Sequence, residues 1–136
     1  MKIQTRQKTH KREKQMDKTK AKELAFDIVK VLDNKKAFNI KVLDVGNQTV
    51  IADYFVIACA SNNTQINAIA DEVEFKTAEN GINCTRREGR MGADWTVLDY
   101  DSVIVHIFNR DTRSKFNLEK LWADAEDLDI TQLITE

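Results

Sequence analysis

The run YFVIACA, residues 54–60, is the longest uninterrupted apolar stretch of the chain, and it places the strongest constraint on the fold. A helix that crosses a bilayer needs about 20 apolar residues, whereas a strand buried on both faces needs only about four to eight. The run therefore predicts a central buried strand and no membrane segment. With 136 residues, of which 42% are hydrophobic, the chain is long enough for one domain with a real core.

Further helices and strands are predicted on either side of this strand. Apolar residues recur at helical spacing in residues 24–34 and again in residues 61–81. Alternating or continuous apolar runs predict other strands at 39–45, 82–88, 95–100 and 103–108. Because a helix follows the central strand, residues 54–87 predict a β-α-β unit whose strands are parallel and joined by a right-handed crossover.

The C-terminal part predicts one more helix and a loose end. In the segment SKFNLEKLWADA, one helical face carries Leu118, Leu121, Trp122 and Ala125, and we expect Leu121 and Trp122 to be core residues. The acidic residues 126–136 show little periodicity, so we expect a loosely held tail.

Charge divides the chain unevenly. Residues 1–22 carry nine Lys and Arg against Glu13 and Asp17, so 9 minus 2 gives +7. The whole chain carries −1, which leaves −1 minus 7, or −8, for residues 23–136. Residues 1–20 therefore form a basic N-terminal arm on an acidic domain, residues 21–125. Such an arm either contacts RNA phosphates or is a solvated terminus, and the sequence leaves both open.

The cysteines and the N-terminus indicate the compartment. Cys59 and Cys84 belong to no CxxC pair and have no nearby His, which predicts free thiols and no zinc site. The N-terminus has no apolar core of a secretory signal, so we expect a cytoplasmic protein.

Asp99 and Asp101, in the segment DYD, admit two interpretations. They are either the metal ligands of a nucleotidyltransferase-like enzyme or part of a tight turn between two strands. Favoured hairpin turns need a positive φ, which Asp tolerates better than most residues. We find no third carboxylate ligand, and the nearby EGRMGAD segment fits neither a P-loop nor GxGxxG. The sequence favours the turn and predicts neither a metal nor a catalytic site.

Three side chains of the predicted strands stand out. Strand alternation puts Trp95 and Tyr100 on opposite faces, so at least one of them is a candidate exposed aromatic. His106 shares a face with Ile104 and Phe108, and a lone His in an apolar strand is more often hydrogen-bonded core than catalyst.

Three segments, in this order and spacing, resemble the ribosomal silencing factor family, also called Iojap-like proteins: ADYFVIACASNNTQINAIADEVE, EGRMGADWTVLDYDSVIVHIF and LEKLW. The similarity runs from about Leu24 to Ala125. It implies an α/β fold with a mixed five-stranded sheet flanked by helices, similar in shape to nucleotidyltransferases but without their catalytic residues. It also implies a protein without cofactors that binds the large ribosomal subunit through ribosomal protein uL14. Binding there blocks association with the small subunit and represses translation, chiefly under nutrient limitation.

The resemblance also implies which residues make this contact, and that free members form homodimers. The Trp of the ADW segment is Trp95, the residue after Asp in the following strand is Tyr100, and the aromatic before the LE pair is Phe116. The chain departs from the family at Phe116, which is usually Tyr, and at Asp101–Ser102, where many members have Gly-Asp.

Overall fold

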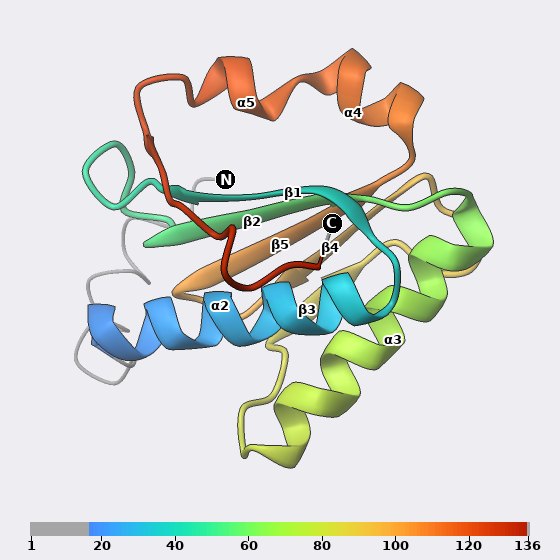
Figure 1. Cartoon of the computed structure of the whole chain (residues 1–136), viewed down its shortest axis with the longest axis horizontal. Coiled ribbons are helices and arrows are strands. Elements are labelled where there is room, and N and C mark those ends of the chain that lie inside the picture. Colours follow the sequence, from blue (N-terminus) through green and yellow to red (C-terminus); the bar gives the residue numbers. More distant parts are fainter. Residues whose placement is uncertain (1–16, 136) are drawn as a thin grey trace.

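The computed structural model describes residues 17–135, so most of the predicted basic arm, residues 1–20, lies outside the described residues. The described chain folds into three layers, with one sheet between two layers of helices (Figure 1). The helices are α2 (Lys18–Asn34), α3 (Asn63–Glu79), α4 (Arg110–Phe116) and α5 (Leu118–Leu121). The strands are β1 (Phe38–Asp44), β2 (Tyr54–Cys59), β3 (Arg86–Glu88), β4 (Trp95–Asp99), β5 (Val103–Phe108) and β6 (Glu126–Asp127).

The sheet is mixed and has the order β3-β4-β5-β2-β1-β6. Strands β2 and β5 pair in parallel, whereas all other neighbours are antiparallel. This confirms the α/β class with a mixed sheet; the sixth strand, β6, is a two-residue addition to the five expected. β3 runs in the same direction as β2, as predicted, but β5 and β4 lie between them.

The main core lies between the sheet and helices α2 and α3. Asp17 caps α2 by accepting a hydrogen bond from the Lys20 amide, and the stripe predicted from Leu24 to Leu32 is fully buried. Every residue of β2 and β5 is buried, since both strands are covered on both faces. The apolar run at 54–60 is thus the centre of the molecule, as predicted.

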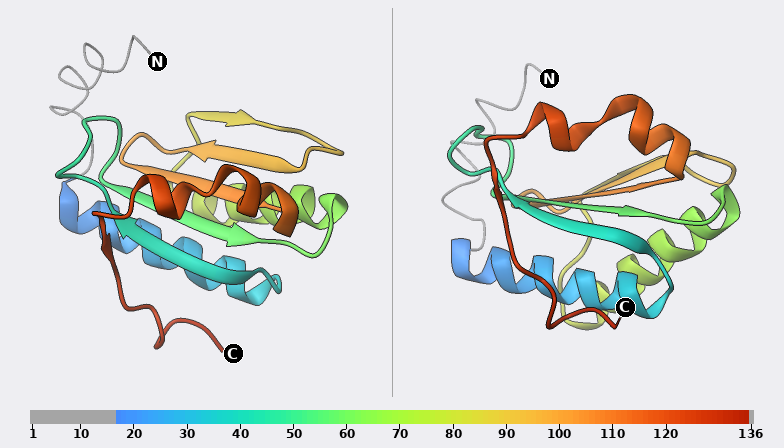
Figure 2. Two further views of the ribbon diagram at one scale, coloured as in Figure 1. Left: turned by 90° about the horizontal axis from the view of Figure 1, so that it is seen from above. Right: turned by 45° about the horizontal axis from the view of Figure 1, so that its top comes forward.

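Helices α4 and α5 cover the opposite face of the sheet, as two views show (Figures 1 and 2). The predicted single helix is interrupted because Asn117 adopts a left-handed conformation (φ 48°) and caps α5. Leu118, Leu121, Trp122 and Ala125 therefore do not lie on one face of a continuous helix. Trp122 still packs edge-on against Phe55, but Leu121 is 71% exposed, so the prediction that Leu121 is a core residue is wrong.

The acidic C-terminal segment is held more firmly than the sequence indicated. It adds β6 to the edge of β1 and then runs beside α2 (Figure 2). Ile130 is buried, and Leu128, Leu133 and Ile134 pack against the main core. These apolar residues are spaced without a regular period, which is why the pattern did not indicate their burial. The prediction of a loosely held tail is wrong.

Two observations concern the cysteines and the length of the helices. Cys59 and Cys84 are free thiols, the first buried and the second partly buried. None of the helices within residues 17–135 combines the length and apolar character that a membrane crossing requires.

Candidate functional site

Asp99 and Asp101 lie at the hairpin that joins β4 to β5. Asp101 has a φ of 68°, and its amide donates to the Asp99 carboxylate at 2.8 Å. The Asp101 carboxylate accepts from the Thr85 hydroxyl at 3.1 Å. The turn interpretation is confirmed. Within residues 17–135, no cluster of three or more His, Cys, Asp or Glu side chains has the geometry to hold a metal ion.

Trp95 and Tyr100 lie on opposite faces of the sheet, as the alternation of β4 predicts. Residues 96, 98 and 100 face α2 and α3 and are buried, whereas Trp95 and Val97 face the α4 side and are partly buried. Trp95 is therefore the accessible member of the pair.

Tyr100 belongs to the main core. It is only 4% exposed, and its hydroxyl lies 2.8 Å from the Thr77 hydroxyl on α3. Burial raises the pKa of Tyr100 to about 12. A phenol held in this way does not reach the surface on which Trp95 lies, so the structure gives no support to Tyr100 as a contact residue.

Trp95 and Phe116 do come together. Their ring centroids are 4.8 Å apart, and the Trp95 ring lies equally close to Phe108. Phe116, at the end of α4, is 50% exposed. We call the three side chains the aromatic cluster (Trp95, Phe108 and Phe116): Phe108 is buried beneath, and Trp95 and Phe116 expose stiff apolar area beside the sheet. Such area is typical of protein interfaces.

A glycine fixes where Trp95 enters the strand. Gly89, in the EGRMGAD loop, has a φ of +91°, and a Cβ there would lie 2.6 Å from the Trp95 carbonyl oxygen. Any other residue would displace the backbone of Trp95 or strain the loop. Gly89 therefore shapes the start of β4.

His106 supports Trp95 from the neighbouring strand β5. Its Nδ1 accepts a hydrogen bond from Trp95 Nε1 at 3.2 Å, and its ring packs edge-on against Phe55. Burial lowers the pKa of His106 to about 4, so the ring is neutral at physiological pH. The interpretation of His106 as a hydrogen-bonded core residue is confirmed for one ring nitrogen.

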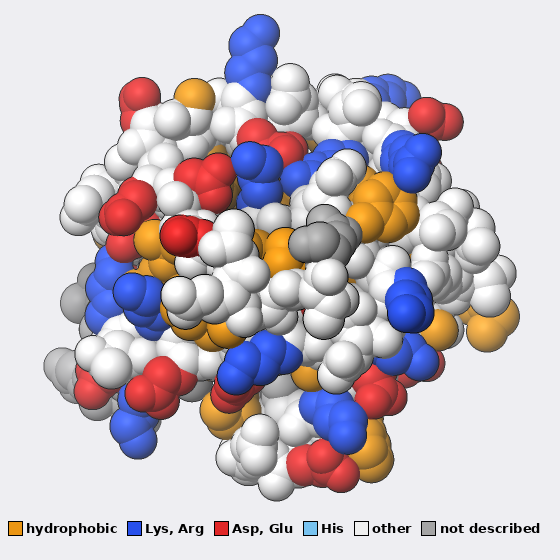
Figure 3. Space-filling model, viewed as in Figure 1, with side chains coloured by type: hydrophobic (Ala, Val, Ile, Leu, Met, Phe, Trp, Pro, Cys, Tyr) orange, Lys and Arg blue, Asp and Glu red, His pale blue; other side chains and the backbone are white. Residues whose placement is uncertain are grey.

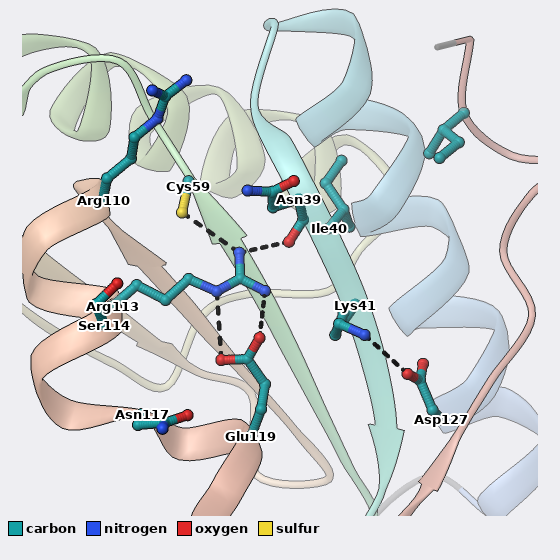
Figure 4. A pocket seen from close by; sticks show the side chains of 11 residues that line it. Asn39, Ile40, Lys41, Cys59, Arg110, Arg113, Ser114, Asn117, Glu119 and Asp127 are labelled. Carbon is teal, nitrogen blue, oxygen red and sulfur yellow. Dashed lines mark hydrogen bonds and ion pairs between the residues drawn. The ribbon is translucent and has the colours of Figure 1, made fainter.

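Arg113 holds α4 and α5 on the sheet, and sequence reasoning missed it. Its guanidinium makes two hydrogen bonds to the Glu119 carboxylate, at 2.8 and 3.3 Å, and also donates to the Asn39 carbonyl and to Cys59 Sγ (Figure 4). These contacts line a polar cavity of about 700 Å³. The charge of Arg113 is thus already compensated by Glu119, and its contacts fix the helix that carries Phe116.

The surface seen in Figure 3 carries acidic and basic side chains intermixed, without a large region of one sign. A protein that binds RNA with its folded body carries a broad basic face, and this view shows none.

Comparison with known proteins identifies the family. Residues 18–136 match the family described as "Ribosomal silencing factor during starvation". The chain belongs to the ribosomal silencing factor family. It is 43% identical over 93 residues to the ribosomal silencing factor of Bacillus subtilis, covering 68% of this chain and 79% of the relative. It is 37% identical over 107 residues to that of Halalkalibacterium halodurans, covering 79% of this chain and 92% of the relative.

A solved structure agrees with this silencing factor fold. A protein from Chromobacterium violaceum superposes with a TM-score of 0.71 at 26% identity, covering 79% of this chain and 88% of that chain. Membership places the protein among ribosome-associated regulators of translation. The sequence resemblance to this family, and the fold that it implied, are confirmed.

Proposed function

We propose that this silencing factor binds the large ribosomal subunit through ribosomal protein uL14 and sterically blocks association with the small subunit. Translation falls as a result, chiefly under nutrient limitation. The protein acts in the cytoplasm, without a cofactor and without catalysis, and it is a homodimer when free. The observation that carries the proposal is an accessible aromatic cluster, centred on Trp95, in a chain of this family.

The geometry of the aromatic cluster supports its use as a contact surface. Trp95 is partly buried and Phe116 is half exposed, so both offer area to a partner without leaving their places in the fold. Trp and other aromatic side chains dominate interface hot spots because they bury large area at low entropic cost. Tyr100 is left out of the proposed contact because it is buried on the other face.

The alternative function, a metal-dependent nucleotidyltransferase-like enzyme using Asp99 and Asp101, has less support. Both carboxylates accept hydrogen bonds within the hairpin, from the Asp101 amide and the Thr85 hydroxyl. A two-carboxylate metal site needs further oxygen ligands converging on the ion, and the hairpin geometry favours the turn over such a site.

The test compares Phe116→Ala with Phe75→Ala. Phe75 is a matched control, because it is 58% exposed but lies on α3, on the opposite side of the sheet. We expect Phe116→Ala to weaken co-sedimentation with purified large subunits by about tenfold or more, equivalent to ~1.4 kcal/mol, and Phe75→Ala to bind normally. The same variant should fail to repress translation in a reconstituted system.

Trp95→Ala is the stronger test at the same surface. Because Trp95 packs on Phe108, this variant should lose both binding and some stability, so its melting temperature must be measured alongside. If Phe116→Ala and folded Trp95→Ala both co-sediment with large subunits as the wild type does, the aromatic cluster is not the contact surface and the proposal fails.

A further inference from the structure

An apolar cavity of about 230 Å³ lies beside the aromatic cluster, on the same face of the sheet. Four neighbouring strands and the loop before β2 supply its walls: Ile51, Phe55, Arg86, Glu88, Val97, Asp99, Ile104 and His106. None of these described residues belongs to α4 or α5, so the strands and the loop before β2 form the lining without the two helices. A cavity of roughly 150 Å³ is enough to bind benzene, so this one has room for a large side chain.

His106, one of the polar residues that line this cavity, has an unusual hydrogen-bonding state. His106 Nδ1 accepts from Trp95 Nε1, and a neutral imidazole has one donor and one acceptor nitrogen, so the proton lies on Nε2. His106 is only 8% exposed, and Nε2 has no hydrogen-bond partner among residues 17–135. A buried donor without an acceptor costs free energy. A protein can keep such a donor where a ligand supplies the acceptor on binding.

We propose that the cavity receives one apolar side chain of the large-subunit protein, and that a backbone carbonyl oxygen beside that side chain accepts a hydrogen bond from His106 Nε2. This inference rests on the proposed function and names the chemistry of its contact. Nε2 is covered in the free protein, so the incoming carbonyl reaches it only when a side chain of the cavity wall moves. The Trp95 hydrogen bond holds the tautomer that makes Nε2 the donor.

Charge and position favour a basic protein segment as the occupant. Residues 23–136 carry 12 Lys and Arg and 20 Asp and Glu, and 12 minus 20 gives −8. This charge attracts a basic protein and repels RNA. The lining carries Glu88 and Asp99 against Arg86, which lies 3.6 Å from the Glu88 carboxylate, so it has a net charge of 1 minus 2, or −1. The Trp95–His106 contact makes the cavity continuous with the aromatic cluster.

The experiment uses the full chain and purified large subunits with two cavity variants. His106→Phe keeps an aromatic ring but removes both the Nε2 donor and the Nδ1 acceptor of the Trp95 hydrogen bond. Val97→Phe fills the cavity and leaves His106 and its bond to Trp95 in place. We expect each to weaken binding by about tenfold or more. His106→Phe should melt near the wild-type temperature, because removal of an unpartnered buried donor offsets the lost Trp95 hydrogen bond. A purely structural His106 would give the reverse: lower stability and unchanged binding. Phe75→Ala again serves as the control.

The outcomes separate this inference from the proposed function. Normal binding by both cavity variants, with weak binding by Phe116→Ala, overturns the cavity proposal and leaves the proposed function standing. Normal binding by His106→Phe, Val97→Phe and Phe116→Ala overturns both the cavity proposal and the proposed function. If the cavity variants become monomeric in sedimentation yet bind subunits normally, the occupant is a second copy of this chain and the proposal is wrong. If His106→Phe does not fold, Val97→Phe alone decides.

Discussion

His106 links burial to a measurable pH dependence. Its pKa is about 4 in the folded chain and 6.5 ordinarily, because burial disfavours the imidazolium. Between these values the unfolded chain binds more protons than the native chain. The free energy of unfolding therefore falls as the pH is lowered through this window, by up to roughly 3 kcal/mol. Urea unfolding at several pH values from 7 to 4 measures the slope.

His106→Phe is the control for this slope. Carboxylates such as Glu119, whose pKa Arg113 lowers through their hydrogen bonds, also titrate near the acid end, but they do so in both variants. Their contribution cancels in the difference between the two profiles. If the profiles of wild type and His106→Phe run parallel from pH 6.5 to 4, the imidazole is not held neutral by the fold.

Tyr100→Phe tests the placement of Tyr100 in the core. Removing the phenol oxygen deletes the contact with Thr77, whose hydroxyl keeps its own bond to the Val73 carbonyl. We expect a loss of about 1 kcal/mol of stability in chemical denaturation and no change in large-subunit binding. Adding Thr77→Val should cost less in the Tyr100→Phe background than alone, because the two share one hydrogen bond. Weaker binding at unchanged stability would return Tyr100 to the contact surface.

The helices and strands themselves divide into those that sequence periodicity predicts and those that it does not. The strand at 54–60, the stripe of α2 and the alternation of β4 follow from local patterns, because burial on one or two faces dictates them. The break at Asn117 follows from its left-handed backbone and its cap on Lys120, which the apolar period does not reveal, whereas the burial of Ile130 depends on contacts far along the chain. Local spacing carries no signal for either.

The candidate site divides in the same way. The faces of Trp95 and His106 follow from alternation, and the turn at Asp101 follows from its spacing. The role of Arg113 does not, because its partners are as distant as Asn39, 74 residues away. Phe116 was indicated only by the family resemblance, and the structure shows that its ring packs against Trp95.

Arg113→Met tests how α4 and α5 are held on the sheet. The substitution keeps the aliphatic length but leaves the Glu119 carboxylate and the Asn39 carbonyl without their donor. We expect roughly 2 kcal/mol less stability and weaker large-subunit binding, because Phe116 loses its fixed position. Arg110→Met, an exposed residue of the same helix lying over the Phe38 ring, is the matched control. Equal effects of the two changes on stability and binding would contradict the role of Arg113.

The molecule as a whole has two unlike sides. Helices α2 and α3, of 17 residues each, cover one face of the sheet, whereas α4 and α5 have only seven and four residues. The short helices bury Phe108 but leave Trp95 and Phe116 within reach of a partner. The long-helix side supplies the stability, and the short-helix side supplies the proposed contacts. Of the 21 Lys and Arg of the chain, nine lie in residues 1–22, and three of these, Lys18, Lys20 and Lys22, belong to α2.

Deleting residues 1–16 tests whether the basic arm reaches ribosomal RNA. This segment holds six Lys and Arg and one Glu, and its removal leaves Asp17 to cap α2. A contact with RNA phosphates releases counterions, so each phosphate neutralised steepens a log-log plot of affinity against salt by nearly one unit. We expect the truncated protein to bind large subunits more weakly at low salt and with a flatter salt dependence.

A full-length variant in which these six Lys and Arg are changed to Gln separates charge from chain length. It should reproduce the flatter slope of the deletion, because the counterion effect depends on charge alone. Both variants should converge with the wild type at high salt, where the aromatic cluster carries the binding. If the deletion and the Gln variant retain the wild-type slope, the arm is a solvated terminus and the RNA contact is wrong.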